Sequence, residues 1–302
     1  MSGRGRQDGG SGRDDAEELR AAVNPDSAVL PHREVSRTEI YYFSGTGNSL
    51  AVARDLAGRL GARLIPLASV AEQESIDPAA DAVGLVFPLY DFRPPSMVER
   101  FIRRLGNVGG RYVFAVCTYG IAPSRSLHRL DRALRACGGH LAAGFAVAMP
   151  HSGIGGQALS STEREKLLAN WPRRIDGICG CISARTEARI ESGFPLRALV
   201  RPALVKMLPY LLRYVKQVAR KGVQSLAMTA GRDCDGCRVC ARICPVGNID
   251  IVAGRPLWQD HCAGCFACLH WCPKKAISLG GLDMGIQACH HPDVGLTDMI
   301  RR

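Results

Sequence analysis

Long apolar runs and aromatic residues are scarce in this sequence. Aromatic residues make up 6% of its 302 residues, and no stretch reaches the ~18 to 20 uninterrupted apolar residues that a membrane-spanning helix requires. The first 37 residues lack the charged start, apolar segment and small-residue cleavage site of a secretory signal. We therefore expect a cytoplasmic protein without a spanning helix. The hydrophobic fraction of 46% is ample for a buried core, which excludes wholesale disorder.

Acidic residues are outnumbered by basic ones, and the formal net charge is +11. No nucleic-acid-binding motif accompanies this charge, so we expect no nucleic-acid partner. Thirteen cysteines would indicate a disulfide scaffold in a short secreted chain, but eight of them fall between Cys234 and Cys272, in two runs with metal-ligand spacing. Reduced cysteines that hold metal fit this pattern better, and bound anionic groups would offset part of the positive charge.

Composition divides the chain into segments. Residues 1–37 are rich in Gly, Ser, Arg and Asp, which predicts a disordered tail. Beyond them, apolar runs alternate with amphipathic stretches. The expected strands are residues 39–43, 63–66, 82–87, 112–117 and 141–149, and the expected helices are residues 49–60, 95–105 and 124–137. Continuous apolar runs suit parallel strands covered by helices on both faces, so residues 38–192 are expected to form a doubly wound α/β domain.

A further helix is expected over residues 162–192, where it could cover the last face of the sheet. Residues 193–230 follow as a basic connector, in which residues 196–221 contain seven basic residues and no acidic one, with prolines at Pro202 and Pro209. One interpretation is a pair of helices whose apolar side packs on a neighbouring domain. The other is a docking surface for an acidic partner or for an anionic membrane face.

Two cysteine runs carry the strongest signal in the sequence. The first places cysteines with the spacing C-x2-C-x2-C-x3-C-P at Cys234, Cys237, Cys240 and Cys244, and the second repeats it at Cys262, Cys265, Cys268 and Cys272. Three cysteines two residues apart can wrap around one [4Fe–4S] cluster, whereas the fourth lies too far along the chain and ligates the other cluster. Zinc takes four ligands per ion and does not explain two runs that each end in Cys-Pro.

The spacing therefore predicts two crossed ligand sets. One cluster is expected on Cys234, Cys237, Cys240 and Cys272, and the other on Cys262, Cys265, Cys268 and Cys244. Residues 231–281 resemble bacterial two-cluster ferredoxins, including a short apolar stretch after each run, at residues 248–251 and 276–279. The resemblance implies a small α+β domain.

Five further cysteines lie outside the runs. Cys117 ends an expected strand and Cys137 an expected helix, so both are expected to be packing residues. The remaining three, Cys179, Cys181 and Cys289, have no metal-binding partners at an established spacing, and the sequence leaves their role open.

A glycine loop follows the first expected strand. It consists of Ser44, Gly45, Thr46, Gly47, Asn48 and Ser49. No lysine follows as in a nucleoside triphosphate loop, and Leu50 stands where a dinucleotide-binding loop has its third glycine. Hydroxyl groups and backbone N–H groups at a helix N-terminus suit a phosphate monoester, although a turn without a ligand is the alternative. The loop resembles the flavodoxin phosphate loop T-x-T-G-x-T with Ser at both ends, which implies FMN as the cofactor.

Two more loops follow expected strands at the edge of the sheet where ligands of doubly wound proteins bind. Tyr90 lies in one loop, and Thr118, Tyr119 and Gly120 lie in the other. Tyr90 and Tyr119 could stack on a flavin ring, while backbone amides near Gly120 could reach its polar edge. Each tyrosine taken alone fits a half-buried packing residue better, and only the combination with the glycine loop favours a flavin contact.

The order of segments resembles that of the flavodoxin–ferredoxin fusion proteins often called hybrid ferredoxins. The resemblance covers a flavodoxin-like domain (38–192), the connector (193–230) and a ferredoxin-like domain (231–281), and leaves the C-terminal tail (282–302) outside. Ile121 stands where these proteins usually have a second glycine. The resemblance implies an electron carrier with two [4Fe–4S] clusters and FMN, which exchanges electrons with a redox partner that we expect to be acidic.

Two other functions stay open at this point. One is a flavin-dependent reductase of a small substrate that draws electrons from its own clusters, although no side chain is placed convincingly as its acid or base. The other is an iron–sulfur module attached to an empty flavodoxin-like domain.

Overall fold

A computed structural model describes residues 38–153, 159–193, 202–221, 227–280, 286 and 288–300. All of them belong to one compact unit, Arg37–Arg302. The N-terminal stretch that we expect to be a disordered tail, residues 1–37, lies outside the described residues.

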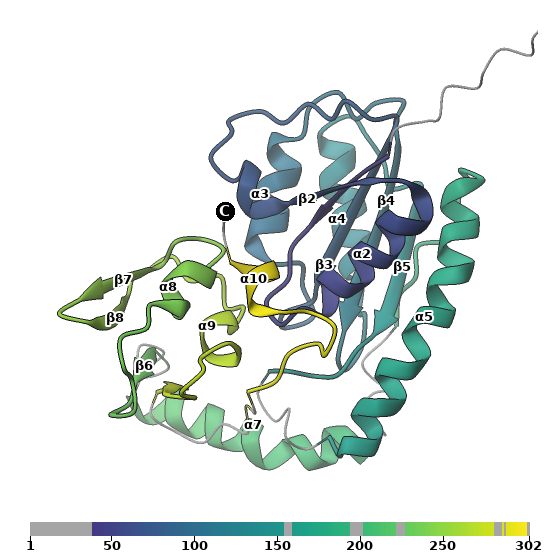
Figure 1. The fold of residues 1–302 in the computed structure, drawn as a ribbon. Coiled ribbons are helices and arrows are strands. Elements are labelled where there is room, and N and C mark those ends of the chain that lie inside the picture. The colour runs from purple at the N-terminus through teal and green to yellow at the C-terminus, as the bar shows by residue number, and fades with distance from the viewer. Residues whose placement is uncertain are drawn as a thin grey trace, which may run out of the picture. The chain divides into compact units, whose positions relative to one another are not determined.

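Five parallel strands form the central sheet. They are β1 (Thr38–Tyr42), β2 (Arg63–Pro66), β3 (Ala82–Pro88), β4 (Tyr112–Tyr119) and β5 (Ala143–Ala148). Their order in the sheet is β2-β1-β3-β4-β5, with every neighbouring pair parallel. This is the strand order of the flavodoxin-like doubly wound fold, so the expected fold class is confirmed (Figure 1).

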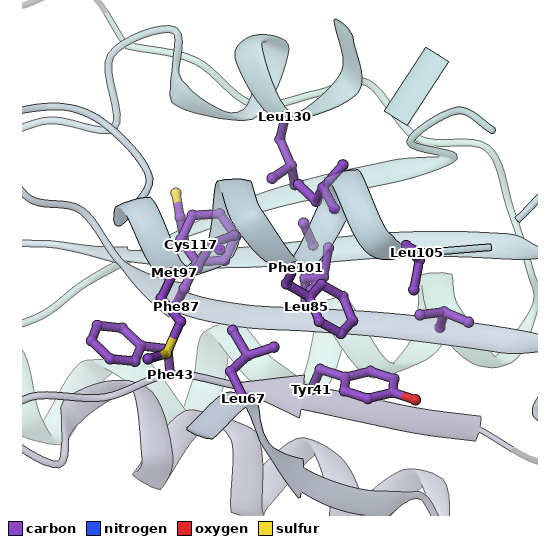
Figure 2. Packing of buried hydrophobic residues seen from close by; sticks show 14 of the residues in the cluster. Tyr41, Phe43, Leu67, Leu85, Phe87, Met97, Phe101, Leu105, Cys117 and Leu130 are labelled. Atoms are coloured by element: carbon purple, nitrogen blue, oxygen red, sulfur yellow. The ribbon is translucent and has the colours of Figure 1, made fainter. Parts of the chain in front are cut away.

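Helices cover both faces of the sheet. They are α2 (Asn48–Leu60), α3 (Ser96–Arg104), α4 (Ser126–Ala136) and α5 (Ser161–Ser183), with a short 3-10 turn η1 (Leu67–Val70). The apolar sides of α2 and α5 pack with Ile40 and Phe114 in one core cluster. The other face carries α3 and α4, where Met97 lies beside Phe87 and Phe101 beside Leu85 (Figure 2). Two-sided cover explains why the central strands are continuous apolar runs.

The expectation of a helix over residues 162–192 is right for its first two thirds only. The helix starts at a capping box, in which Ser160 and Glu163 bond each other's backbone N–H groups, and it ends at Ser183. The following segment is extended: the N–H groups of Ala188 and Glu191 donate to the carbonyl oxygens of Ala142 and Gly144. Because β5 is an edge strand, its free carbonyl groups draw this segment alongside them.

In the described part of the basic connector, residues 202–221 form one helix, α7 (Pro202–Lys221), which continues through Pro209. Pro202 occupies the first turn, where its missing N–H costs nothing, and Pro209 is accommodated inside the helix. The expectation that the apolar side of this stretch is covered is wrong for the described side chains, because those that are large and apolar are 50–66% exposed: Val205, Leu208, Leu211, Leu212 and Val215. None of the helices in the described ranges is long and apolar enough to cross a membrane.

A small α+β region carries the cysteine runs. Its strands are β6 (Met228–Ala230), β7 (Ile249–Val252), β8 (Arg255–Trp258) and β9 (Ile277–Leu279), and its helices are α8 (Val239–Ile243) and α9 (Ala267–His270). Strand β6 pairs with β9, and β7 pairs with β8, both antiparallel. The two apolar stretches expected after the runs thus belong to β7 and β9, and this small region agrees with the expected ferredoxin-like class.

The backbone repeats itself in the two runs. Positive φ angles occur at three equivalent positions, namely Gly236 and Gly264, Arg238 and Phe266, and Gly247 and Lys275. Arg238 and Phe266 precede α8 and α9 as their N-terminal capping residues. A backbone that turns in the same way at the same places carries the two sets of thiols in equivalent positions, which extends the repeat of the sequence into three dimensions.

Candidate functional site

Three loops meet the carboxyl edge of the sheet beside β1 and β3, where the strand order reverses. In doubly wound proteins ligands bind at this edge. The glycine loop follows β1, Tyr90 follows β3, and Thr118 and Tyr119 are the last two residues of β4. A hydrogen bond of 2.7 Å between the hydroxyl groups of Ser49 and Thr118 joins the first of these loops to β4.

The glycine loop ends at the start of α2. Gly47 is the capping residue and has a left-handed φ of 92°, which favours glycine there. Its N–H donates to Ser44 Oγ at 3.0 Å, and no side chain caps the first turn of the helix. An uncapped helix N-terminus leaves N–H groups for an anion, so the local structure fits the phosphate of FMN.

The hydroxyl residues of this loop are buried: Ser44 and Thr46 are 9% exposed and Ser49 is 1% exposed. Asn48 does not point toward an open pocket, since its side-chain N–H donates to the carbonyl oxygen of Pro150 at 3.2 Å. The structure therefore brings all the predicted phosphate-loop residues together with Thr118. Pro150 is a neighbour that sequence patterns did not indicate.

The residues predicted to hold a flavin ring have other neighbours as well. Burial raises the pKa of the Tyr90 hydroxyl well above its ordinary value, and the ring meets Phe43 edge to face at 6.2 Å. Gly120 backs onto His151: a Cβ atom on Gly120 would lie 2.7 Å from His151 Nδ1. Packing alone thus accounts for the absence of a side chain at Gly120.

The first crossed cysteine set lines one hollow of the surface. Cys234, Cys237, Cys240 and Cys272 surround it, together with the apolar side chains of Ile251 and Ile277 and with Arg238 and Lys274. The fourth cysteine of this set comes from the second run, as the spacing predicts for a four-iron cluster. The ligand roles themselves stay a prediction.

The second crossed set also comes together. Burial raises the pKa of the Cys265 thiol, and the charges of Cys268, Cys244 and Cys262 act on it in the same direction. Burial likewise raises the pKa of Cys268 to about 12, and Cys262 and Cys244 add to this rise. Such thiols stay protonated until a metal replaces the proton.

Backbone N–H groups point at the sulfur atoms of both sets. Asn248 donates to Cys244 Sγ at 3.2 Å, and the equivalent residue Ala276 donates to Cys272 Sγ at 3.4 Å. Hydrogen bonds of this kind stabilise thiolate ligands and tune the reduction potential of a cluster.

Among the residues that the structure describes, no group of three or more His, Cys, Asp or Glu side chains is placed to hold a single metal ion. A zinc ion needs each sulfur about 2.3 Å away. A four-iron cluster spaces its four ligands more widely, because iron and sulfide atoms lie between them.

The cysteines outside the runs show no comparable grouping in the described residues. Cys117 is fully buried, as expected, and burial raises the pKa of its thiol. Cys137 is half-buried, with its thiol 3.4 Å from the carbonyl oxygen of Ile102. Cys289 lies 3.5 Å from the guanidinium of Arg164.

A C-terminal segment that the sequence left without a role reaches the glycine loop. The N–H of His291 donates to the carbonyl oxygen of Thr46 at 2.9 Å, and the guanidinium of Arg54 on α2 pairs with Asp298 at 2.7 Å. The same segment contacts the second cysteine run, because His290 stacks on Trp271 at 4.2 Å. No pattern in the sequence distinguishes this segment from a tail without contacts, so the sequence did not predict them.

Comparisons with known proteins add little to this description. The chain matches no protein-family model and no curated protein sequence. Solved structures that resemble it include Smu.1420 from Streptococcus mutans (14% identity, 47% of this chain and 98% of that one, TM-score 0.34). Two others are a putative flavoprotein from Bacteroides uniformis (17%, 47% and 98%, 0.31) and a Megasphaera elsdenii flavodoxin (22%, 37% and 85%, 0.28). These likenesses are too weak to carry an argument, so the fold assignment rests on strand order and connections.

Proposed function

We propose that this protein is an iron–sulfur flavoprotein that transfers electrons. The observation that carries the proposal is the hollow lined by Cys234, Cys237, Cys240 and Cys272, because a cysteine from the second run completes the set of the first. That crossing is the ligand pattern of two [4Fe–4S] clusters and has no counterpart in a structural zinc site.

The two clusters supply one-electron oxidation and reduction, and the chain sets their environment. Cys262, Cys265, Cys268 and Cys244 hold the second cluster. Around the first, Arg238 and Lys274 place positive charge that favours the more negative, reduced state. Lys274 is partly offset by Asp235, whose carboxylate lies 3.7 Å away.

FMN is the second cofactor of the proposal, because it can exchange one electron or two. Ser44, Thr46 and Ser49 and the first turn of α2 would bind its phosphate, while Tyr90 and the Tyr119–Gly120 loop would border its ring. FMN is favoured over FAD or NAD because the loop offers donors for one phosphate and no acidic residue about 20 positions later would bind a ribose.

We divide the chain accordingly into a flavodoxin-like domain (38–192), a basic connector (193–230) and a ferredoxin-like domain (231–281). The connector and the basic residues near the first cluster favour an acidic redox protein as the electron donor or acceptor. Cysteines that must stay reduced to hold clusters favour the cytoplasm.

One observation favours a second candidate, an iron–sulfur protein whose flavodoxin-like domain holds no flavin. The carbonyl groups of Gly45 and Thr46 accept hydrogen bonds from Trp271 and His291, so other parts of the chain already contact the loop. In that case the loop is a structural contact rather than a phosphate site.

Iron, sulfide and flavin assays on anaerobically purified protein, with a visible spectrum, test both candidates. The first expects about eight iron and eight sulfide per chain together with one flavin that is released as FMN. Full iron and sulfide without flavin, and no uptake of added FMN, would establish the second candidate. Stoichiometric zinc without sulfide would overturn both.

A further inference from the structure

Gly45 lies inside the glycine loop, yet neither the turn nor the helix cap requires a glycine there. The positive φ that the loop needs belongs to Gly47. At Gly45 an added Cβ atom would lie 2.5 Å from the carbonyl oxygen of Cys265 and 2.8 Å from the hydroxyl of Tyr90. Because backbone cannot yield as a flexible side chain can, the close approach of Cys265 explains the glycine.

A second contact reaches the same residue. The indole N–H of Trp271 donates to the carbonyl oxygen of Gly45 at 3.0 Å, and both groups are buried. Cys265 and Trp271 lie on the two sides of α9 (Ala267–His270). The short helix in the second cysteine run is therefore fixed to Gly45 at both of its ends.

The two cysteine sets differ in their exposure to solvent. Each set has one exposed cysteine, Cys237 in the first and Cys262 in the second. The other three cysteines of the second set, Cys244, Cys265 and Cys268, are buried, whereas only Cys240 of the first set is buried. The first set thus lies at an open surface, beside Arg238 and Lys274. The second set touches the glycine loop through Cys265.

We propose that Gly45 is the contact site on which the ferredoxin-like part docks, through Cys265 and Trp271. We propose that this contact fixes the order of electron transfer. The Cys234 set would hold the cluster that exchanges electrons with an external protein, and the Cys265 set would hold the cluster that exchanges them with the flavin. Two successive single electrons from a low-potential protein donor, with two protons from water, would convert the oxidised flavin to its two-electron reduced form. This order rests on the proposed function, whereas the docking role of Gly45 does not.

The docking role is tested by Gly45→Ala, with Gly58→Ala as the matched control, because a Cβ atom on Gly58 of α2 would meet nothing within 4 Å. Hydrogen exchange is measured on the purified, cluster-loaded protein. In Gly45→Ala the amides of residues 265–272 are expected to exchange about tenfold faster, which corresponds to roughly 1.4 kcal/mol of local opening free energy. Exchange equal to that of the control would overturn the docking role.

Trp271→Phe serves as the second variant should Gly45→Ala fail to fold. It removes the N–H that donates to the Gly45 carbonyl oxygen and shortens the buried side chain by one ring, while it keeps an aromatic ring for His290 to stack on. Faster exchange over the same amides supports the docking role of Gly45, and unchanged exchange in Trp271→Phe contradicts it.

The order of transfer is tested with Cys234→Ser and Cys244→Ser, each loaded with FMN. After photoreduction, Cys234→Ser should still reduce its flavin at a rate independent of protein concentration, whereas Cys244→Ser should lose this internal reduction. With an acidic ferredoxin as donor, Cys234→Ser should also fail. The reverse pattern would overturn the order. Protein that binds no FMN would overturn the proposed function and the order together, while the exchange result at Gly45 would stand on its own.

Discussion

The backbone N–H of His291 donates a hydrogen bond of 2.9 Å to the carbonyl oxygen of Thr46, so the C-terminal segment is anchored to the glycine loop. The imidazole of His291 is 2% exposed, its Nδ1 accepts from the N–H of Asp293 at 3.2 Å, and its Nε2 has no hydrogen-bond partner among the described residues. Burial lowers the pKa of His291, and the neighbouring carboxylate of Asp293 only partly opposes this.

This relationship predicts a loss of stability in mild acid. The folded protein favours neutral His291, whereas the unfolded chain binds the proton with a pKa of about 6.5. The free energy of unfolding should therefore be fully present above that pH and fall as the pH drops below it, by at most ~1.4 kcal/mol per pH unit. Thermal unfolding between pH 8 and pH 5 should show a weaker pH dependence in His291→Gln than in His140→Gln, a matched change at a histidine whose side chain is 45% exposed. Identical slopes would contradict the prediction.

Crossed ligation predicts that each run's last cysteine serves the other run's cluster. Cys272→Ser should damage the cluster of Cys234, Cys237 and Cys240, and Cys244→Ser the other one, because the missing thiolate leaves one iron without its protein ligand. Iron and sulfide content and the spectra of the reduced clusters identify which one is lost. Cys137→Ser, outside the runs, is the control and should keep both clusters. Loss of the cluster held by the mutated run's own first three cysteines would show that the ligation is not crossed.

The proposed flavin site predicts that the hydroxyl side chains of the glycine loop contribute to the affinity for FMN. Ser44→Ala combined with Thr46→Val should weaken FMN binding at least about a hundredfold, since a hydrogen bond to a charged group contributes roughly 1.5–3 kcal/mol. Isothermal titration of FMN into flavin-depleted protein measures the effect. Ser69→Ala is the control, because the hydroxyl of Ser69 lies outside the loop and donates to the carbonyl oxygen of Pro66. An FMN affinity in the double variant equal to that of the unchanged protein would contradict the assignment of the phosphate site to this loop.

Basic side chains at the first cluster predict a raised reduction potential. Arg238→Gln with Lys274→Gln should lower the potential of that cluster by roughly 10–40 mV, the equivalent of the ~0.2–1 kcal/mol typical of exposed charge interactions. Redox titration followed by electron paramagnetic resonance separates the two clusters. Arg132→Gln on α4 should leave both potentials unchanged. A higher potential in the double variant would reverse the assigned role of these charges.

Helix α7 predicts salt-dependent association with an acidic partner. Its described apolar side chains are uncovered, and Arg213 and Lys216 are exposed beside them. Reduction by an acidic ferredoxin should slow as salt rises, because exposed charges are screened over about 8–10 Å at physiological ionic strength. Arg213→Glu with Lys216→Glu should slow it further, and the same charge change at Arg129 and Arg132 of α4 should not.

Two outcomes would contradict this use of α7. If the rate of reduction by an acidic ferredoxin does not depend on salt, α7 is a solvent-exposed helix without a role in docking. Sedimentation of the protein with anionic vesicles, lost in the Arg213→Glu and Lys216→Glu variant, would instead assign α7 to a membrane surface.

Local patterns predicted much of the fold from the sequence. The central strands are apolar runs of a length that only a doubly covered parallel sheet buries, so β3 and β4 lie where their residues indicate. The helix over residues 162–192 was placed too long, because its last part follows the edge of β5 and bonds to backbone groups that no local pattern reveals. In the connector, Pro209 interrupts the sequence pattern, whereas in the structure it lies within α7.

The sequence by itself predicts the chemistry of the site, and the tertiary structure decided its arrangement. Cysteine spacing alone indicates two clusters with crossed ligands, because the reach of a few residues is set by covalent geometry. That Cys265 lies against Gly45, and that His291 lies against Thr46, depends on contacts between residues more than 200 positions apart. Such contacts follow from the packing of whole elements and leave no periodic trace in either segment, so only the folded chain shows which cysteine set lies beside the glycine loop.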